Sequence, residues 1–246
     1  MNTKISDHPY RMYKFLKGHL KQVLTRADVV VPKTDSDMWY WLRQTASICT
    51  VIDIGANNGD FADFLANYFK ANQTYVFEPS PLYRQELELK KNNIRNLKIF
   101  NVGLSDTTGE ETFFQNSYGP ASSFLKISDQ SRAEFPQTSS ETATQVKVAR
   151  LDDLLATEPL ETEIFIKIDV QGFEDKVIQG GHQTFAKSKY VLVEMSFVPM
   201  YIGQPLFNQI HAQLAEFGHE FAGIKNQIHA ASGQPMFAHC LYIKNT

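Results

Sequence analysis

The sequence contains little cysteine, and its two cysteines, Cys49 and Cys240, do not stand in a CxxC or Cys/His spacing. A disulfide framework or a structural zinc site needs several such residues at short intervals, so we expect neither. Long hydrophobic runs are also lacking. No apolar stretch approaches the roughly 20 residues that span a bilayer, and the N-terminal residues lack the continuous apolar segment of a signal peptide. We therefore expect a cytoplasmic protein without a transmembrane segment.

A strong excess of one charge is absent as well. The net charge is -3 and the pI is about 6.2, whereas nucleic-acid-binding domains usually carry a basic surface. We therefore expect no nucleic acid as partner. Residues 1–33 are the exception, because they contain seven basic and two acidic residues, which leaves the rest of the chain acidic.

The basic segment contains a predicted amphipathic helix, Tyr10–Leu24, with apolar residues at helical spacing and a basic side. Two interpretations stay open: packing against the folded domain, or peripheral contact with an anionic membrane surface. A second helix is expected over residues 38–47. We therefore predict an N-terminal helical extension, residues 1–48, and a folded domain, residues 49–246. No pattern specifies an oligomeric state.

From residue 50 the chain alternates short apolar strands with helices. This succession predicts an α/β fold with a mostly parallel sheet and helices on both faces. His219–Ile224 and Phe237–Lys244 are expected to form an antiparallel C-terminal hairpin. Residues 115–144 are polar and irregular in pattern. They are predicted to be either a lid over a site or a surface excursion.

The first chemical motif is VIDIGANNGDF at residues 51–61, an apolar strand that enters a glycine turn and then a helix. Its glycines allow close approach of a ligand to the backbone. The spacing is GxxxG rather than the GxGxxG that binds a dinucleotide pyrophosphate. S-adenosylmethionine has no phosphate, and the turn amides could bind its carboxylate. The expected ligand-binding residues here are Asp53, Gly55, Ala56, Asn57 and Gly59.

The second motif is an acidic residue, Glu78, at the end of the next strand. An acid in this position can accept hydrogen bonds from both ribose hydroxyls. Asn101 and Val102 follow the third strand, near the expected adenine position. Asp106 either binds the adenine amino group or forms a turn.

Together these segments resemble the FkbM-type methyltransferases. VIDIGANNGDF, VFEPSP, NVGLSDTTG and IKIDVQGFEDKVIQGG correspond to the family's successive motifs, from about residue 50 to residue 200. The chain departs from the family at Gln171, where glutamate is usual. The resemblance implies a Rossmann-like class I methyltransferase fold with seven strands, one of them antiparallel. It also implies S-adenosylmethionine as methyl donor and a hydroxyl oxygen of a sugar, glycan or natural product as acceptor.

Two carboxylates are the catalytic candidates. Asp169 follows a strand that should flank the topological switch point, and it is the first choice to deprotonate or orient the acceptor. Glu194, on the adjacent strand, is the second choice. A divalent cation such as Mg²⁺ on these carboxylates is an alternative that we do not favour, because no compact ligand run supports it. No metal ligands are therefore predicted. Residues 197–205, with Tyr118 and Phe124, are expected to contact a polar, ring-shaped acceptor.

Three other functions are alternatives. An NAD-dependent oxidoreductase has the same fold class, but the GxGxxG motif is missing. A non-catalytic nucleotide-binding protein could retain the fold without turnover, although the candidate residues are intact. Methylation of protein, lipid or nucleic acid is a third alternative, and the acidic body offers no obvious surface for phosphates.

Overall fold

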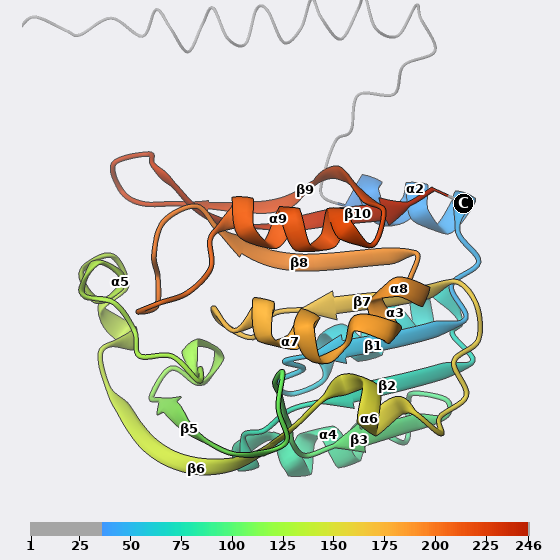
Figure 1. Ribbon diagram of the computed structural model, residues 1–246, viewed down its shortest axis with the longest axis horizontal. Coiled ribbons are helices and arrows are strands. Elements are labelled where there is room, and N and C mark those ends of the chain that lie inside the picture. The colour runs from blue at the N-terminus through green and yellow to red at the C-terminus, as the bar shows by residue number, and fades with distance from the viewer. Residues whose placement is uncertain (1–35, 246) are drawn as a thin grey trace, which may run out of the picture. The chain divides into compact units, whose positions relative to one another are not determined.

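The computed structural model describes residues 36–245 (Figure 1). The chain separates into two units, Met1–Gln44 and Thr45–Thr246, and each is described by itself. In the first unit the described element is helix α2 (Ser36–Thr45), where a helix was expected. The predicted helix Tyr10–Leu24 lies outside the described residues. The boundary between residues 48 and 49 stays a prediction.

A seven-stranded sheet forms the centre of the second unit, with the strand order β3-β2-β1-β7-β8-β10-β9. Strand β10 is antiparallel to both of its neighbours, and the other pairs are parallel. This arrangement confirms the predicted class I methyltransferase fold with an antiparallel C-terminal hairpin. The strands are β1 (Thr50–Ile54), β2 (Gln73–Phe77), β3 (Leu97–Phe100), β7 (Ile164–Ile168), β8 (Tyr190–Ser196), β9 (His219–His229) and β10 (Pro235–Lys244).

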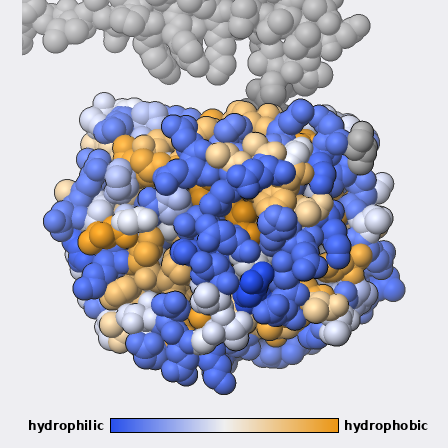
Figure 2. All heavy atoms as spheres, in the orientation of Figure 1, coloured by the Kyte–Doolittle hydropathy of each residue, from blue (hydrophilic) through white to orange (hydrophobic). Residues whose placement is uncertain are grey.

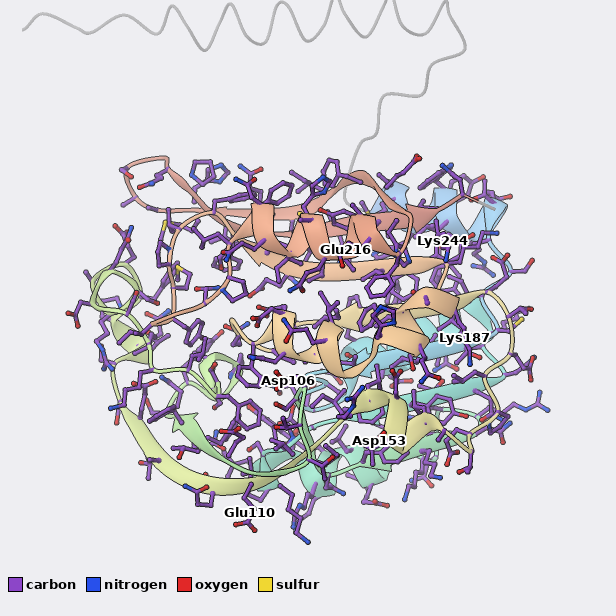
Figure 3. All side chains as sticks on the ribbon, in the orientation of Figure 1. Asp106, Glu110, Asp153, Lys187, Glu216 and Lys244 are labelled. Atoms are coloured by element: carbon purple, nitrogen blue, oxygen red, sulfur yellow. The ribbon has the colours of Figure 1, made fainter. Side chains whose placement is uncertain are left out.

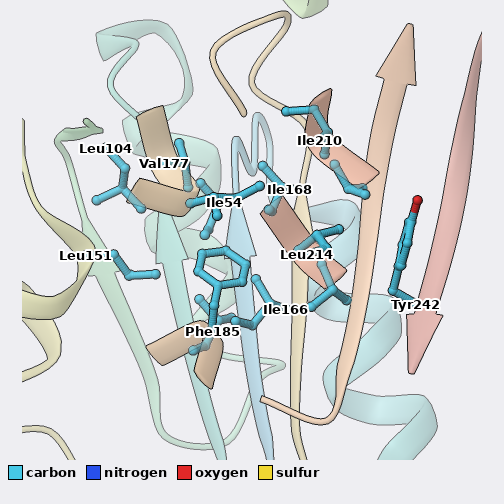
Figure 4. Close-up of a cluster of buried hydrophobic side chains, with 14 of the residues drawn as sticks. Ile54, Leu104, Leu151, Ile166, Ile168, Val177, Phe185, Ile210, Leu214 and Tyr242 are labelled. Atoms are coloured by element: carbon cyan, nitrogen blue, oxygen red, sulfur yellow. The ribbon is translucent and has the colours of Figure 1, made fainter. Parts of the chain in front are cut away.

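Helices cover both faces of the sheet, which explains why every residue of the central strands β1 and β7 is buried. On one face, α3 (Asp60–Phe69) and α4 (Arg84–Lys90) pack through small and branched side chains. The other face carries the larger cluster shown in Figure 4, in which Phe185 packs with Ile54 and Ile166. Its helices are α6 (Leu151–Leu155), α7 (Glu174–Gly180), α8 (His182–Lys187) and α9 (Phe207–Glu216).

Helix α7 ends at Gly180, which is followed by a second glycine, Gly181. The chain does not become irregular, however, because the unpredicted helix α8 begins at His182. Gly180 is required for packing, since a Cβ atom at this position would lie 2.0 Å from the carbonyl oxygen of Ser105. The glycine pair therefore both ends α7 and allows the backbone of Gly180 to lie close to that of Ser105.

Residues 103–149 form a second sheet with the order β4-β6-β5, built from β4 (Gly103–Leu104), β5 (Gly109–Asn116) and β6 (Glu141–Ala149). Between β5 and β6 lie η3 (Gly119–Ala121), α5 (Asp129–Glu134) and η4 (Pro136–Thr138). An isolated bridge joins Ile127 to Tyr201. The segment predicted as irregular is thus organised and attached to the main sheet's loops. Whether it opens stays a prediction.

Within residues 36–245, no helix combines the length and the apolar character needed to cross a membrane. On the face shown in Figure 2, hydrophobic side chains occur in small groups among polar ones.

Candidate active site

A cavity of about 730 Å³ lies at the carboxyl ends of the central parallel strands. Its size suits a ligand pocket, which typically measures about 300–1,000 Å³. The walls come from several parts of the chain. These are the turn after β1, the end of β2, residues 102–104, the segment between β5 and β6, the loops after β7 and β8, and side chains of β8, β9 and β10. It therefore lies at the switch point, where β1 and β7 are neighbours and the strand order reverses.

The two glycines of the first motif have different structural roles. Gly55 lines the cavity at a φ of +75°, and a Cβ there would lie 1.9 Å from the carbonyl oxygen of Asp169. Gly59 adopts a φ of +80°, but its neighbour is Leu87, whose Cδ2 would lie 2.8 Å from an added Cβ. Gly55 thus brings the cavity floor against the β7 loop. Gly59 is not a lining residue, and it allows α3 to pack near α4.

The backbone amides of the glycine turn are already engaged. Gly55 and Ala56 donate to the carbonyl of Phe77, and Asn57 donates to Glu78 Oε2. The N–H groups of residues 58–60 donate to acceptors within the turn. In this structure the turn amides thus donate to protein acceptors, and their binding of a ligand carboxylate stays a prediction.

Glu78 lines the cavity and connects two turns. Its Oε2 accepts a hydrogen bond of 2.8 Å from Asn57 N, and its Oε1 accepts one of 2.8 Å from Ser80 N. Burial raises the pKa of Glu78, although both amides oppose this shift. A carboxylate can accept about four hydrogen bonds, so this one retains capacity for a diol.

Asp53 is completely buried and does not line the cavity. Its Oδ1 lies 3.1 Å from Lys167 Nζ, which also donates to Gly55 O at 2.7 Å and lies 3.9 Å from Asp169 Oδ2. Burial raises the pKa of Asp53, although the nearby Lys167 opposes this shift. Burial would lower the pKa of Lys167, but the negative charges of Asp53 and Asp169 outweigh it and raise that pKa. Asp53 therefore acts on the cavity through Lys167 rather than by direct contact.

The structure brings both catalytic candidates together through Gln171. Its Nε2 donates to Asp169 Oδ1 at 2.7 Å and to Glu194 Oε1 at 2.9 Å. Its Oε1 accepts a hydrogen bond of 2.7 Å from the hydroxyl of Tyr201, and its backbone has a φ of +58°. The amide, unlike the carboxylate usual at this position, can donate to two carboxylates at once. From the sequence, Gln171 was recognised only as a difference from the glutamate usual in the family.

His239 completes this group and was not predicted. Its Nε2 lies 3.7 Å from Asp169 Oδ2 and 3.8 Å from Glu194 Oε2. His239 lies directly opposite Glu194 in the β10–β8 register, which explains why both side chains face the cavity. Among the histidines of residues 36–245, it is the one that lines the cavity.

The two carboxylates have opposite protonation tendencies. Burial would raise the pKa of Asp169, but Lys167, His239 and Gln171 together hold it well below its usual range. Burial, followed by repulsion from Asp169, raises the pKa of Glu194 well above its usual range. Glu194 therefore binds a proton more readily than Asp169.

Two residues predicted near the adenine are not brought into the cavity. Asn101 is exposed, and Asp106 pairs with Lys176 Nζ at 2.8 Å beside α7 (Figure 3). Asp106 is therefore engaged in an ion pair away from the cavity, while Val102 does line it. Their position after the third strand could not show which of these side chains point into the cavity and which point away from it.

The far wall of the cavity is largely apolar. Tyr118 and Phe124 line it as expected. From the segment 197–205, Met200 and Tyr201 line it as well. Further lining residues are Ile127, Phe135, Ile228 and Phe237, with the polar residues Ser131, Gln137 and Thr138 among them. This wall suits a ligand that has an apolar portion, in addition to polar groups.

Comparison with known proteins gives a family match. The sequence profile described as "Methyltransferase FkbM domain" matches residues 53–221. The 2-O-methyltransferase NoeI of Sinorhizobium fredii is 29% identical over 160 residues, which cover 63% of this chain and 66% of that protein. The chain thus matches just under two-thirds of the length of NoeI. The AMB antimetabolite synthetase AmbE of Pseudomonas aeruginosa is 26% identical over 174 residues, which cover 59% of this chain and 8% of that protein.

Two solved structures are also similar. Methyltransferase FkbM from Methylobacillus flagellatus has a TM-score of 0.48 at 15% identity, covering 80% of this chain and 44% of that one. The N-methyltransferase NodS from Bradyrhizobium japonicum, solved with S-adenosylhomocysteine, has a TM-score of 0.49 at 8% identity, covering 86% of each chain. Both scores lie below 0.5, and the fold is assigned from the strand order instead.

Proposed function

We propose that this chain, which belongs to the FkbM methyltransferase family, is an S-adenosylmethionine-dependent methyltransferase that methylates a hydroxyl oxygen of a sugar, glycan or natural product. Residues 49–246 would form the methyltransferase domain and residues 1–48 an N-terminal extension. The observation that carries the proposal is one cavity with Glu78 at one end and the Asp169–Gln171–Glu194 group at the other. The name of the relative NoeI, a 2-O-methyltransferase, supports transfer to oxygen.

The donor end fits S-adenosylmethionine. Glu78 would accept hydrogen bonds from the ribose hydroxyls, which are charge-assisted and therefore strong. The backbone of Gly55–Asn57 would form the floor, and Val102 with Leu104 would provide an apolar wall for adenine. The bound donor supplies an activated methyl group on a sulfonium, so the protein mainly has to align an acceptor oxygen and exclude water.

The acceptor hydroxyl would lie beside Asp169 and Glu194. These two carboxylates would favour loss of the hydroxyl proton. Asp169 holds its negative charge across the ordinary pH range and is suited to orienting the hydroxyl. Glu194 has the higher proton affinity and is the stronger base once it is itself deprotonated. This reverses the order of the two candidates that the sequence favoured.

The apolar far wall supports an acceptor with an apolar portion, such as a natural product or a glycoside with a hydrophobic substituent. A free, fully polar sugar would leave Ile127, Phe135 and Phe237 against water. Burial of apolar surface contributes about 25 cal/mol per Å², so a hydrophobic substituent should improve binding.

Calorimetric titration with S-adenosylhomocysteine tests the donor site. We compare the wild type with Glu78→Ala and with the matched control Asp106→Ala, whose carboxylate pairs with Lys176 outside the cavity. A hydrogen bond to a charged group contributes about 1.5–3 kcal/mol. Glu78→Ala should therefore weaken binding at least about tenfold, and Asp106→Ala should bind like the wild type.

Thermal unfolding of each variant checks that it is folded. Wild-type protein that is folded, ignores S-adenosylhomocysteine and binds NAD(H) would refute the donor assignment. Screening radiolabelled methyl transfer to alkyl glycosides and to the matching free sugars then tests the acceptor class. A donor-binding protein that methylates only amines would contradict the hydroxyl assignment.

A further inference from the structure

Three potential metal ligands converge at the acceptor end of the cavity. Asp169 directly follows β7, Glu194 lies on β8 and His239 lies on β10. One oxygen of each carboxylate and one imidazole nitrogen all lie within 4.8 Å of one another. Three ligands thus come from three neighbouring strands, whose pairing with one another fixes their relative positions.

The distances within this group are those of ligands around an ion rather than those of hydrogen bonds. His239 Nε2 lies 3.7 Å from Asp169 Oδ2 and 3.8 Å from Glu194 Oε2, beyond hydrogen-bonding distance. Two ligands that each lie about 2.1 Å from one ion are separated by at most about 4.2 Å. Both measured pairs fall within this limit, and the remaining pair reaches it by a shift of less than about 1 Å.

Gln171 orients the carboxylates toward this point. Its Nε2 binds Asp169 Oδ1 and Glu194 Oε1, so the second oxygen of each group is turned to His239. The donor groups near those second oxygens lie beyond 3.5 Å: His239 Nε2 is 3.7 Å from Asp169 Oδ2 and 3.8 Å from Glu194 Oε2, and Lys167 Nζ is 3.9 Å from Asp169 Oδ2. Such support of one ligand atom by an outer hydrogen bond is common around protein metal sites.

The local charge also favours a cation. Lys167 Nζ lies 3.9 Å from Asp169 Oδ2, but it is closer to Asp53 and to Gly55 O on its other side. Among residues 36–245, the ion-pair contact of Glu194 is His239 Nε2, at 3.8 Å. As ligands, the two carboxylates would supply two negative charges, which a divalent ion balances.

We propose that Asp169, Glu194 and His239 bind a divalent first-row transition-metal ion, with Mn²⁺ as the probe. Carboxylates suit Mn²⁺ and imidazole suits Fe²⁺ and Zn²⁺, so a mixed set favours these ions over Mg²⁺ or Ca²⁺. The proposal rests on the proposed function, because the ion would coordinate the acceptor hydroxyl from the cavity side.

In that position the ion would acidify the hydroxyl. The proton of the hydroxyl passes to solvent, and the oxygen forms a bond to the methyl carbon. The carbon–sulfur bond breaks, and its electron pair stays on sulfur, which leaves S-adenosylhomocysteine. Asp169 and Glu194 would then promote deprotonation as ligands of the ion.

Mn²⁺ binding is measured by the loss of the free-ion electron paramagnetic resonance signal, with and without S-adenosylhomocysteine. Wild-type protein should bind one equivalent. His239→Ala and His239→Gln should weaken binding at least about tenfold, and Gln171→Ala about 10- to 100-fold, as outer-shell changes do. The matched control is His211→Ala, because His211 bonds to the Tyr242 hydroxyl outside the cavity and its variant should bind Mn²⁺ normally.

The same samples are titrated with S-adenosylhomocysteine, which shows that each variant is folded and keeps the two proposals separate. Wild-type protein that binds S-adenosylhomocysteine but leaves the Mn²⁺ signal unchanged at millimolar ion overturns the metal site. Equal Mn²⁺ affinity in wild type and both His239 variants also overturns it. Mn²⁺ binding that depends on His239 without any S-adenosylhomocysteine binding would support the metal site and refute the donor site.

Discussion

Replacing Glu174 by glutamine should stabilise the protein at alkaline pH but not at acidic pH. Glu174 is the first residue of α7, is 3% exposed, and its Oε1 accepts hydrogen bonds from Val170 N at 3.3 Å and Gly172 N at 3.0 Å. Burial raises the pKa of Glu174 to about 7, although these amides oppose the shift. A glutamine can keep both hydrogen bonds through its own oxygen and has no charge to bury.

The magnitude follows from proton linkage. Below the unfolded pKa, which has a reference value of 4.5, Glu174 is protonated in both states and the wild type loses nothing. As the pH rises toward 7, the unfolded state ionises first, so the folded state loses stability at about 1.4 kcal/mol per pH unit. Above pH 7 both states are ionised, and the accumulated loss is about 3 kcal/mol.

Urea unfolding across this range measures the effect. The difference in free energy of unfolding between Glu174→Gln and wild type should grow by about 3 kcal/mol in favour of the variant between about pH 4 and pH 9. Glu216→Gln, at an exposed position on α9, is the control and should show no such trend. A difference for Glu174→Gln that is independent of pH would refute the reasoning.

Three further outcomes follow from the site. Lys167→Met should lower the free energy of unfolding, measured in urea, by about 3–5 kcal/mol, because it leaves the buried charge of Asp53 uncompensated. Gly55→Ala should abolish S-adenosylhomocysteine binding in calorimetry and lower the melting temperature, because its Cβ would collide with the carbonyl oxygen of Asp169. The rate of methyl transfer should rise with pH above the ordinary range of a glutamate, because Glu194 has a raised pKa and acts when deprotonated. A flat pH profile would contradict that role.

The sequence predicted the part of the site that depends on parallel strands. Glu78, Asp169 and Glu194 each lie at or near the end of an apolar run, and the carboxyl ends of parallel strands meet at one edge of a sheet. The alternation of strands and helices in the sequence was therefore enough to predict that these three side chains lie at the same edge of the sheet. The two glycines were also identified, but Gly59 contacts Leu87 and not the cavity, which spacing alone cannot reveal.

The remainder depends on tertiary register and could not be predicted. His239 reaches Glu194 only because β10 pairs antiparallel with β8 in one particular register, and local patterns do not fix the register of a strand that returns from a distant hairpin. The bridging role of Gln171 depends on its left-handed backbone conformation and on Tyr201, thirty residues later. The sequence left Asp106 between adenine binding and a turn, and its ion pair could not be foreseen because its partner Lys176 is also distant in sequence.

The reversed direction of β10 has a consequence for protein synthesis. Residues leave the ribosome in order, so the glycine turn, Glu78 and Asp169 are all available before His239 has been translated. Because β10 inserts between β8 and β9, the edge of β8 stays unpaired until that last described strand arrives. The group formed by Asp169, Glu194 and His239 is therefore the last part of the cavity to be completed during synthesis.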